Sequence, residues 1–282
     1  MLLVLADNIK KMNDDSYLDE LESKSIYIIR EAYWEYGGNL AALWSMGKDS
    51  TTLVHLIRKA FLGKVPISFF HIDTTFKFRQ IYDFRDRYAH EWNLRLIIAK
   101  NDLALKENMS PEKGRFNCCN ALKTEALKQL IEKYNVKALL VGIRRDEHTI
   151  RAKERYFSQR NKEFRWDYQN QPLELWAEYC KTKGEIGTHF RVHPLLHWRE
   201  IDIWKYIKRE RLPVINLYFA KGTKRYRSIG CECCCQPIES SANTINKIIK
   251  EIQTTRISER SGRSQDKEKE YMMQKLRSLG YM

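Results

Sequence analysis

The sequence predicts an α/β fold built on a doubly wound parallel sheet, and two observations lead to this prediction. From residue 40 onward, β-prone apolar runs alternate with amphipathic helical stretches, which is the pattern of a parallel sheet with helices on both faces. Three of these runs end near residues that suit a ligand, at Ser45, Asp73 and Gly142. Ligands bind beyond the carboxyl ends of the strands in open sheets of this kind, so we expect the three residues to share one edge.

Three regions are predicted along the chain. Residues 1–36 form a helical lead-in, because apolar residues recur there at three- and four-residue spacing with charges between them. Residues 37–216 hold the sheet domain. Residues 217–282 form an irregular Cys- and Arg-rich C-terminal region with little strand pattern, apart from a helix over 242–253.

Within the sheet domain, each strand and helix is predicted from its own pattern. Strands are expected in apolar β-prone segments and helices in amphipathic ones, and the segment 189–213 returns to a strand followed by a helix. Residues 156–190 are polar and aromatic, which predicts an irregular insertion rich in turns. The other strands are predicted in 40–44, 66–72, 94–100 and 136–142, and the other helices in 51–61, 78–93 and 121–135.

The composition indicates a soluble cytoplasmic protein. No apolar run reaches the roughly 20 residues that a membrane-spanning helix needs, and the N-terminal apolar stretch lacks the basic start of a signal peptide. The formal net charge is +14, and basic residues gather in 144–155, 221–227 and 254–264, which suits a polyanion. Seven cysteines in such a chain indicate metal or redox chemistry rather than a disulfide framework.

The most informative segment is 40–52, in which an apolar strand runs into the turn SMGKDS and then into an amphipathic helix. Small residues and Gly47 let successive backbone N–H groups face one concavity, and the N-terminus of the helix favours an anion there. Side-chain donors can be added by Ser45, Lys48 and Ser50. The alternative is a turn whose Ser and Asp only cap the helix.

This turn differs from the Walker loop and resembles another phosphate loop. The Walker loop requires a glycine where this chain has Ala42, and a Ser or Thr where it has Asp49. The turn resembles the SGGxDS loop of the ATP pyrophosphatase superfamily, with Met46 replacing one glycine. The resemblance implies an adenine nucleotide alpha hydrolase-like fold and cleavage of ATP, with Mg²⁺, between the α and β phosphates. The residues that would bind the nucleotide in the loop are Ser45, Gly47, Lys48, Asp49 and Ser50.

Two further segments are expected to meet the nucleotide. Asp73 and Thr74 follow a predicted strand beside the loop and resemble the second nucleotide motif of the same superfamily. Gly142 ends the strand of 136–142 and is the third contact. For Asp73 the alternative is a carboxylate that only forms the turn after the strand.

Cations are crowded in the segment 144–155, at Arg144, Arg145, Arg151, Lys153 and Arg155. Such crowding is unfavourable unless an anion or carboxylates neutralise the charge. Guanidinium groups match the oxygens of sulfate and phosphate, so the sequence predicts a site for charge on the transferred group. The predicted catalytic residues are Lys48, Arg144, Arg145 and Arg151. The alternative is a solvated helix face on which Asp146, Glu147 and Glu154 pair with the cations.

This stretch, with further motifs as far as residue 266, resembles the small ATP-using subunit of the two-subunit sulfate adenylyltransferase over residues 30–282. The resemblance implies that AMP is joined to sulfate and that a GTPase subunit is the partner. It also implies that the tail with Arg256, Arg260 and Arg263 folds back over the nucleotide. A surface tail is the alternative.

The cysteines depart from that family. Cys118 and Cys119 form a vicinal pair, and the run 231–235 contains a distant C-x-x-C. This pattern resembles the cluster ligands of adenylylsulfate reductases and of the ATP pyrophosphatase component of Dnd/Ssp-type DNA phosphorothioation systems. It implies a [4Fe–4S] cluster on Cys118, Cys119, Cys231 and Cys234, with Cys233 or Cys235 as substitutes. Zinc in a Cys₄ site and unliganded buried thiols are the alternatives, and Cys180 stands alone.

Two readings of the function follow. The first is an ATP pyrophosphatase that adenylylates the DNA backbone for phosphorothioate modification, with DNA and a cysteine desulfurase as partners. Its basis is the cysteine pattern together with the basic run 221–227, which ATP and sulfate do not explain. The alternative is the sulfate adenylyltransferase small subunit, which makes adenylylsulfate and pyrophosphate from ATP and sulfate.

Overall fold

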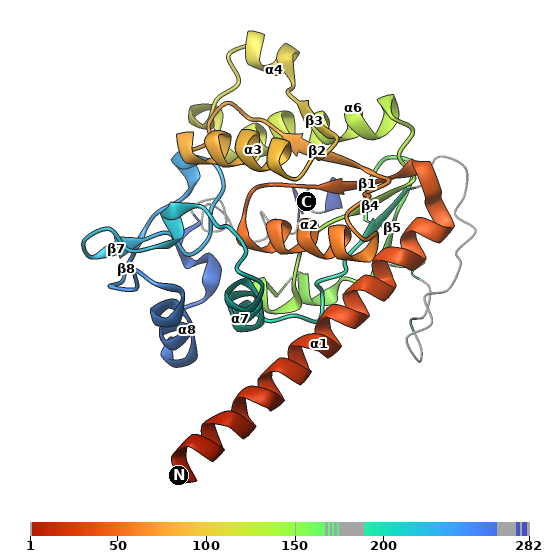
Figure 1. Cartoon of the computed structure of the whole chain (residues 1–282). Coiled ribbons are helices and arrows are strands. Elements are labelled where there is room, and N and C mark those ends of the chain that lie inside the picture. Colours follow the sequence, from red (N-terminus) through yellow and green to blue (C-terminus); the bar gives the residue numbers. More distant parts are fainter. Residues whose placement is uncertain are drawn as a thin grey trace.

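The computed structural model describes residues 2–149, 151–166, 169, 171, 174, 189–263, 275, 276 and 278–280. Within them, a six-stranded sheet has the order β3-β2-β1-β4-β6-β5 (Figure 1). Neighbouring strands are parallel except β5, which is antiparallel to β6. This confirms the predicted α/β class. The strands are β1 (Leu40–Leu43), β2 (Ser68–Ile72), β3 (Leu96–Ala99), β4 (Ala138–Leu140), β5 (Phe157–Arg160) and β6 (His189–Val192).

Strand β5 corrects the prediction of an irregular insertion at 156–190. Its sequence FSQR looks polar, yet all four residues are buried. The Arg160 guanidinium donates to Glu154 at 3.0 Å and to the Ser158 hydroxyl at 2.8 Å, so its charge is satisfied inside the protein. A strand whose polar groups are paired internally has no apolar alternation to reveal it. Much of 167–188, including Cys180, lies outside the described residues.

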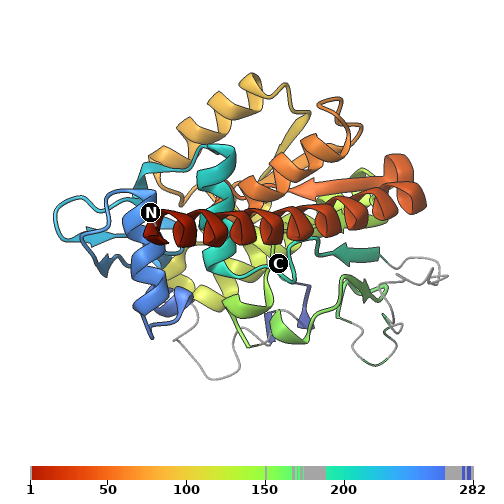
Figure 2. The same cartoon turned by 60° about the horizontal axis from the view of Figure 1, so that its bottom comes forward.

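Helix α1 (Leu2–Tyr36) coincides with the predicted lead-in and crosses α7 (Glu200–Glu210), as Figure 2 shows. The Lys205 ammonium pairs with Asp14 at 2.8 Å. Further along α1, the Ser25 hydroxyl donates to the Pro194 carbonyl at 2.8 Å and accepts from the Trp198 indole at 2.9 Å. Buried polar bonds of this kind fix α1 against the sheet domain.

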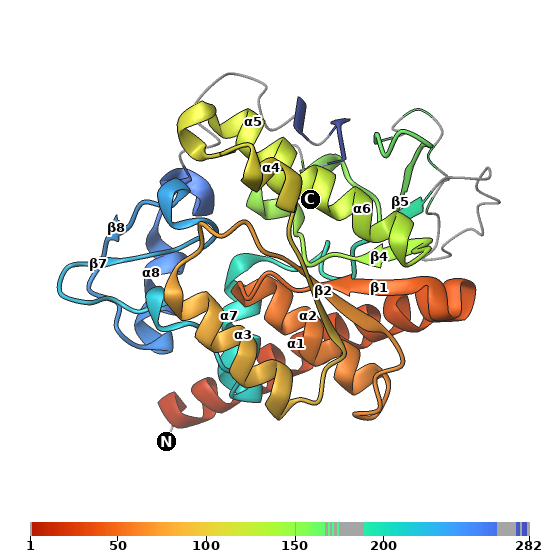
Figure 3. The same cartoon turned by 90° about the horizontal axis from the view of Figure 1, so that it is seen from above.

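The remaining helices cover both faces of the sheet. Figure 3 shows α2, α3 and α7 on one side, and α4, α5 and α6 on the other, which is the doubly wound arrangement. Their bounds are α2 (Lys48–Ala60), α3 (Arg79–Glu91), α4 (Asp102–Lys106), α5 (Arg115–Cys119) and α6 (Ala126–Lys133). The helix predicted over 121–135 is in fact a π-helical segment (Asn120–Glu125) that runs on into α6.

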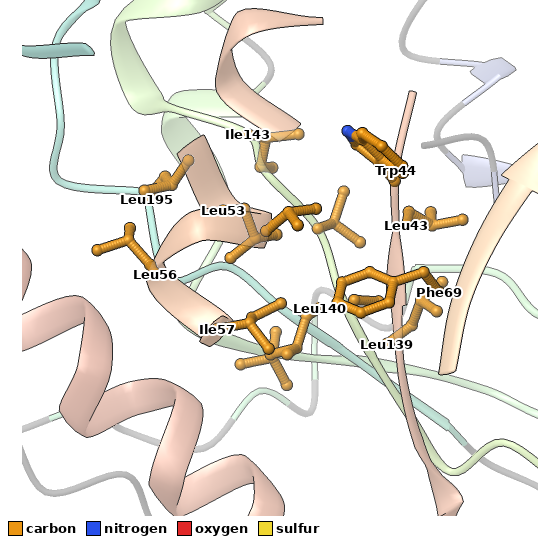
Figure 4. Packing of buried hydrophobic residues seen from close by; sticks show 14 of the residues in the cluster. Leu43, Trp44, Leu53, Leu56, Ile57, Phe69, Leu139, Leu140, Ile143 and Leu195 are labelled. Carbon is orange, nitrogen blue, oxygen red and sulfur yellow. The ribbon is translucent and has the colours of Figure 1, made fainter. Parts of the chain in front are cut away.

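The core holds the phosphate-loop segment against the sheet. Leu53 and Ile57 of α2 face Phe69, Leu139 and Leu140 of the sheet (Figure 4), and all five side chains are buried. In the strand order of the sheet, β1 lies between β2 and β4. The loops that follow these three strands therefore open on the same edge.

The C-terminal region contains α8 (Ile245–Thr254), which matches the predicted helix, and a small ribbon of β7 (Lys224–Arg225) and β8 (Ile238–Glu239). These elements lie together at one end of the molecule (Figure 1). Two arginines of the basic run point inward. The Arg225 guanidinium pairs with Glu251 at 2.5 Å, and that of Arg227 pairs with Glu200 at 2.6 Å.

No helix in the described parts of the chain is both long enough and apolar enough to span a membrane.

Candidate nucleotide site and thiol group

A cleft lies beyond the carboxyl ends of β1, β2 and β4. It brings the turn after β1 together with Gly142 and Arg151, as predicted, and adds residues from the C-terminal region. Cys231 also lines this cleft, so the candidate phosphate loop and the cysteine run share one hollow. The lining residues that carry the argument are Ser45, Gly47, Asp49, Ser50, Lys77, Lys123, Gly142, Glu147, Arg151, Tyr218, Cys231, Glu259 and Arg263.

The turn itself has the shape of a phosphate loop. Met46 has a φ of 65°, the left-handed conformation that glycine adopts without strain, and it stands where the resembling loop has glycine. The Ser50 hydroxyl donates to the Gly47 carbonyl at 3.1 Å and accepts from the Ser45 N–H at 3.2 Å. These bonds hold the turn at the N-terminus of α2, where the helix favours an anion.

The hydroxyl of Tyr218 completes the turn from far along the chain. It accepts a hydrogen bond of 2.9 Å from the backbone N–H of Lys48, the first residue of α2. Tyr218 is fully buried, and burial raises the pKa of its hydroxyl. No local sequence pattern predicts this contact, because the tyrosine lies 170 residues from the turn.

Gly142 lies where two segments approach each other closely. A Cβ atom at this position would lie 3.2 Å from the backbone of Asp49 and of Ser50. That spacing is tighter than most side-chain carbons adopt, so a larger residue here would displace the start of α2 by a few tenths of an ångström.

The main cations of the site are neutralised by carboxylates. Lys48 pairs with Asp49 at 2.9 Å and also with Glu259. Arg144 is fully buried and pairs with Asp49, with Glu259 and, at 2.9 Å, with Asp146. Burial alone would raise the pKa of Glu259, but the charges of Arg144 and Lys48 outweigh burial and lower it. Glu259, which no local sequence pattern indicates, is thus a second shared partner of Lys48 and Arg144, in addition to Asp49.

The other two predicted catalytic arginines lie differently. Arg151 lines the cleft and pairs with Glu147, whose other oxygen accepts from Arg260 at 3.1 Å. Arg145 is exposed, does not line the cleft, and lies over the ring of Tyr156 at 5.1 Å. Of the carboxylates anticipated in the alternative interpretation of this segment, Glu147 pairs with Arg151 and lines the cleft, and Asp146 is exposed and pairs with Arg144. The third, Glu154, is buried and pairs with Arg160 instead.

Asp73 and Thr74 do not line the cleft. The Asp73 carboxylate accepts from the Thr75 N–H at 2.8 Å and from the Tyr82 hydroxyl at 3.0 Å, which forms the turn after β2. Burial would raise the pKa of Asp73, but these hydrogen bonds and Lys100 lower it. Thr74 instead contacts the cysteine run, with its hydroxyl 3.2 Å from the Cys231 sulfur.

Four thiols predicted as ligands come together from two segments. Cys118 and Cys119 end α5, and Cys231 and Cys234 come from the distant run, all four buried. Burial raises the pKa of Cys118 to about 12, and the neighbouring thiols of the other three add to the effect. Burial also opposes ionisation of Cys231, yet the charges of Lys123 and Lys77 outweigh it and lower its pKa to about 7.

The two substitute ligands have other surroundings. Cys233 is exposed. The Cys235 sulfur accepts from the Gly230 N–H at 3.1 Å and from the Arg263 guanidinium at 3.0 Å. Among the described residues, no three His, Cys, Asp or Glu side chains lie close enough to hold a single metal ion.

Lys77 also lines the cleft, although the sequence pattern does not predict it. Its backbone forms a bridge with that of Cys231, and burial lowers the pKa of its ammonium to about 8. The only local signal is its position shortly after Asp73 and Thr74, at the start of the segment that leads into α3.

An open parallel sheet with a phosphate loop at its carboxyl edge defines a nucleotide-binding α/β enzyme. Residues 39–237 match the phosphoadenosine phosphosulfate reductase domain, and the chain belongs to this family. Its relatives include the sulfate adenylyltransferase subunit 2 of Geotalea uraniireducens, 40% identical over 94% of this chain and 98% of that protein. The corresponding subunit of Psychromonas ingrahamii is 39% identical over 96% and 99%.

Solved structures support the fold. The phosphoadenylyl-sulfate reductase of Candida auris matches with a TM-score of 0.51 and 19% identity, over 76% of this chain and 97% of that one. Yeast FAD synthetase matches with a TM-score of 0.56 and 16% identity, over 88% and 90%. The resemblance to the sulfate adenylyltransferase small subunit is thus confirmed, whereas the likeness of the cysteine pattern to a phosphorothioation component stays a prediction.

Proposed function

We propose that this enzyme transfers the adenylyl group of MgATP to an oxyanion and releases pyrophosphate. The observation that carries the proposal is the meeting of Lys48 and Arg144 at the N-terminus of α2, beside the Ser45–Ser50 turn. Backbone donors, a helix N-terminus and two fixed cations are what a leaving pyrophosphate requires.

The reaction follows from this arrangement. An oxygen of the acceptor attacks the α phosphorus and forms a new P–O bond, while the bond from the α phosphorus to the bridging oxygen of the pyrophosphate breaks. Lys48 and Arg144 are buried and do not line the cleft themselves, but both pair with Glu259, which does. From this position we expect the two cations to stabilise the charge that develops on the pyrophosphate, and Arg151 lines the cleft directly. Because these groups are positioned before the reaction, little reorganisation accompanies the transfer.

Sulfate is the acceptor that we propose first. The relatives that cover almost the whole chain at about 40% identity carry the name sulfate adenylyltransferase subunit 2. A second subunit, a GTPase in the family that the sequence resembles, would then be the partner.

The DNA backbone is the second candidate acceptor, and the group of four buried cysteines favours it. Adenylylation of sulfate moves no electrons and uses no thiolate, so four buried thiols beside the cleft have no task in that reaction. Four thiols from two loops are the donor set of a [4Fe–4S] cluster, which Cys118, Cys119, Cys231 and Cys234 would hold. Such a group suits sulfur chemistry at an activated phosphate, with a cysteine desulfurase as the sulfur source. The inward-facing Arg225 and Arg227 give this candidate no support.

Pyrophosphate release from MgATP tests the proposal. We expect release to depend on an added oxyanion, and the response to sulfate alone, or to duplex DNA alone, identifies the acceptor. Lys48→Met should abolish release, whereas Arg87→Met, a matched loss of charge on the exposed face of α3, should not. Release that is the same with and without either acceptor, or that survives in Lys48→Met, would refute the proposed reaction.

A further inference from the structure

The cleft has two ends, and different charges act at each. At the loop end, Glu259 pairs with Lys48 and Arg144. At the other end, the backbone of Lys77 bridges that of Cys231, whose sulfur lies 3.2 Å from the Thr74 hydroxyl. Lys77 therefore belongs to the cysteine end of the same cleft.

The cations of the loop end are already matched with carboxylates, and Lys77 is not. Lys48 and Arg144 share Asp49 and Glu259, and Arg151 has Glu147. The Lys77 ammonium forms no hydrogen bond or ion pair with any residue that the structure describes, although the Cys231 thiol and the Asp73 carboxylate act on its charge without bonding to it. Lys77 is half-buried and lines the cleft, and a half-buried ammonium without a bonded partner suits a ligand that carries negative charge.

The geometry of the displacement indicates which ligand Lys77 would bind. In a displacement at phosphorus, the attacking and leaving oxygens lie roughly in line on opposite sides. Since the loop end would hold the leaving pyrophosphate, the acceptor must approach from the cysteine end, where Lys77 lies. We propose that Lys77 binds the acceptor oxyanion, a tetrahedral sulfate or phosphodiester group, and so determines acceptor affinity. This inference rests on the proposed adenylyl transfer.

A binding measurement tests the inference without turnover. Radiolabelled sulfate, or a labelled duplex oligonucleotide, is titrated into the full chain in the presence of an ATP analogue whose α–β bridge is a methylene group. Loss of one charge-assisted hydrogen bond in Lys77→Met should weaken acceptor binding by about tenfold or more, since such a bond contributes roughly 1.5–3 kcal/mol. The affinity for the analogue should be unchanged, and Lys77→Arg should restore part of the acceptor affinity.

Two controls separate this role from a structural one. Lys100→Met removes a neighbouring lysine that pairs with Asp73 outside the cleft, and it should bind the acceptor as the unmodified protein does. The melting temperature of each variant shows whether the fold is intact. Unchanged acceptor affinity in Lys77→Met, or a loss confined to the ATP analogue, would overturn the inference.

The binding titrations, compared with pyrophosphate release, also show whether this inference or the proposed function has failed. If the unmodified protein binds sulfate or DNA through Lys77 but releases no pyrophosphate, the reaction is wrong and the oxyanion site stands. If pyrophosphate release depends on the acceptor yet Lys77→Met leaves its KM unchanged, the reaction stands and the role of Lys77 is wrong. Sulfate and DNA are tested in separate titrations, so the one whose affinity responds to Lys77 is the acceptor class.

Discussion

The Lys48 ammonium in the phosphate loop pairs with the carboxylate of Glu259, which lies 211 residues further along the chain. The same carboxylate pairs with Arg144. The described part of the tail therefore reaches the candidate site at Glu259 and Arg263, which line the cleft, whereas Arg256 is exposed. A bound pyrophosphate group has to share these two cations with Glu259 or take its place.

Neutralising Glu259 should therefore strengthen pyrophosphate binding. Glu259→Gln removes a buried negative charge close to the expected phosphates while keeping a side chain of similar shape. We expect pyrophosphate to inhibit this variant at about tenfold lower concentration, the effect of about 1.4 kcal/mol of relieved repulsion. Titration calorimetry with pyrophosphate provides the measurement, and Glu239→Gln on the exposed ribbon is the matched control. Weaker binding in Glu259→Gln would show instead that the carboxylate orients Lys48 and Arg144.

The sheet and the phosphate loop could be predicted because their signals are local. The pattern that predicts the turn after β1 lies within a dozen residues, and Gly142 follows its strand directly. Glu259 and Tyr218 were missed because each reaches the loop from far along the chain, and a single sequence carries no signal of such pairing. The sequence also does not show which charged side chains are buried. Arg225 and Arg227 of the basic run therefore look like surface residues, whereas in the structure they pair with Glu251 and Glu200.

The basic run 221–227 divides into two kinds of cation with different expected effects. Arg227→Met leaves Glu200 buried without its partner, and we expect a loss of about 3–5 kcal/mol in the free energy of unfolding. Lys221 and Lys224 are exposed, and their double substitution by Glu should cost at most about 1 kcal/mol of unfolding free energy, from the lost pairing of Lys224 with Glu239 across the ribbon.

Duplex DNA affinity measured across salt concentrations then tests the charge argument. If DNA binds this surface, only the double lysine variant should flatten the salt dependence, by about 0.9 in log affinity per log salt for each lost phosphate contact. A flattened slope in a folded Arg227→Met protein would contradict the internal placement of that arginine.

We expect four cysteines to bind iron and the two adjacent cysteines, Cys233 and Cys235, not to bind it. Protein prepared without oxygen should contain iron and sulfide, and substitution of Cys118, Cys119, Cys231 or Cys234 by Ser should each remove the iron. Cys233→Ser and Cys235→Ser are the controls, because one thiol is exposed and the other sulfur is held by Gly230 and Arg263.

Elemental analysis distinguishes the alternatives for this group. One zinc and no iron would replace the cluster by a Cys₄ zinc site. Neither metal, with all six described cysteines reactive after unfolding, would leave buried thiols without a ligand.

Acid should destabilise the protein in part through His71. This side chain is buried beneath the loop, where its Nδ1 lies 3.0 Å from the Trp44 carbonyl, and burial, together with the charge of Lys77, lowers its pKa to about 3. The unfolded chain takes up a proton near the ordinary pKa of about 6.5, whereas the folded protein does not. The contribution of His71 to the free energy of unfolding is therefore fully present above that pH and falls as the pH drops towards 3, by up to about 1.4 kcal/mol per pH unit.

His71→Asn, which retains a donor for the Trp44 carbonyl, should lose less unfolding free energy than the unmodified protein between neutral pH and about pH 4.5. Denaturant unfolding at the two pH values measures this difference, with His90→Asn on the exposed side of α3 as the control. Equal losses in the unmodified protein and in His71→Asn would mean that His71 is protonated within the folded structure.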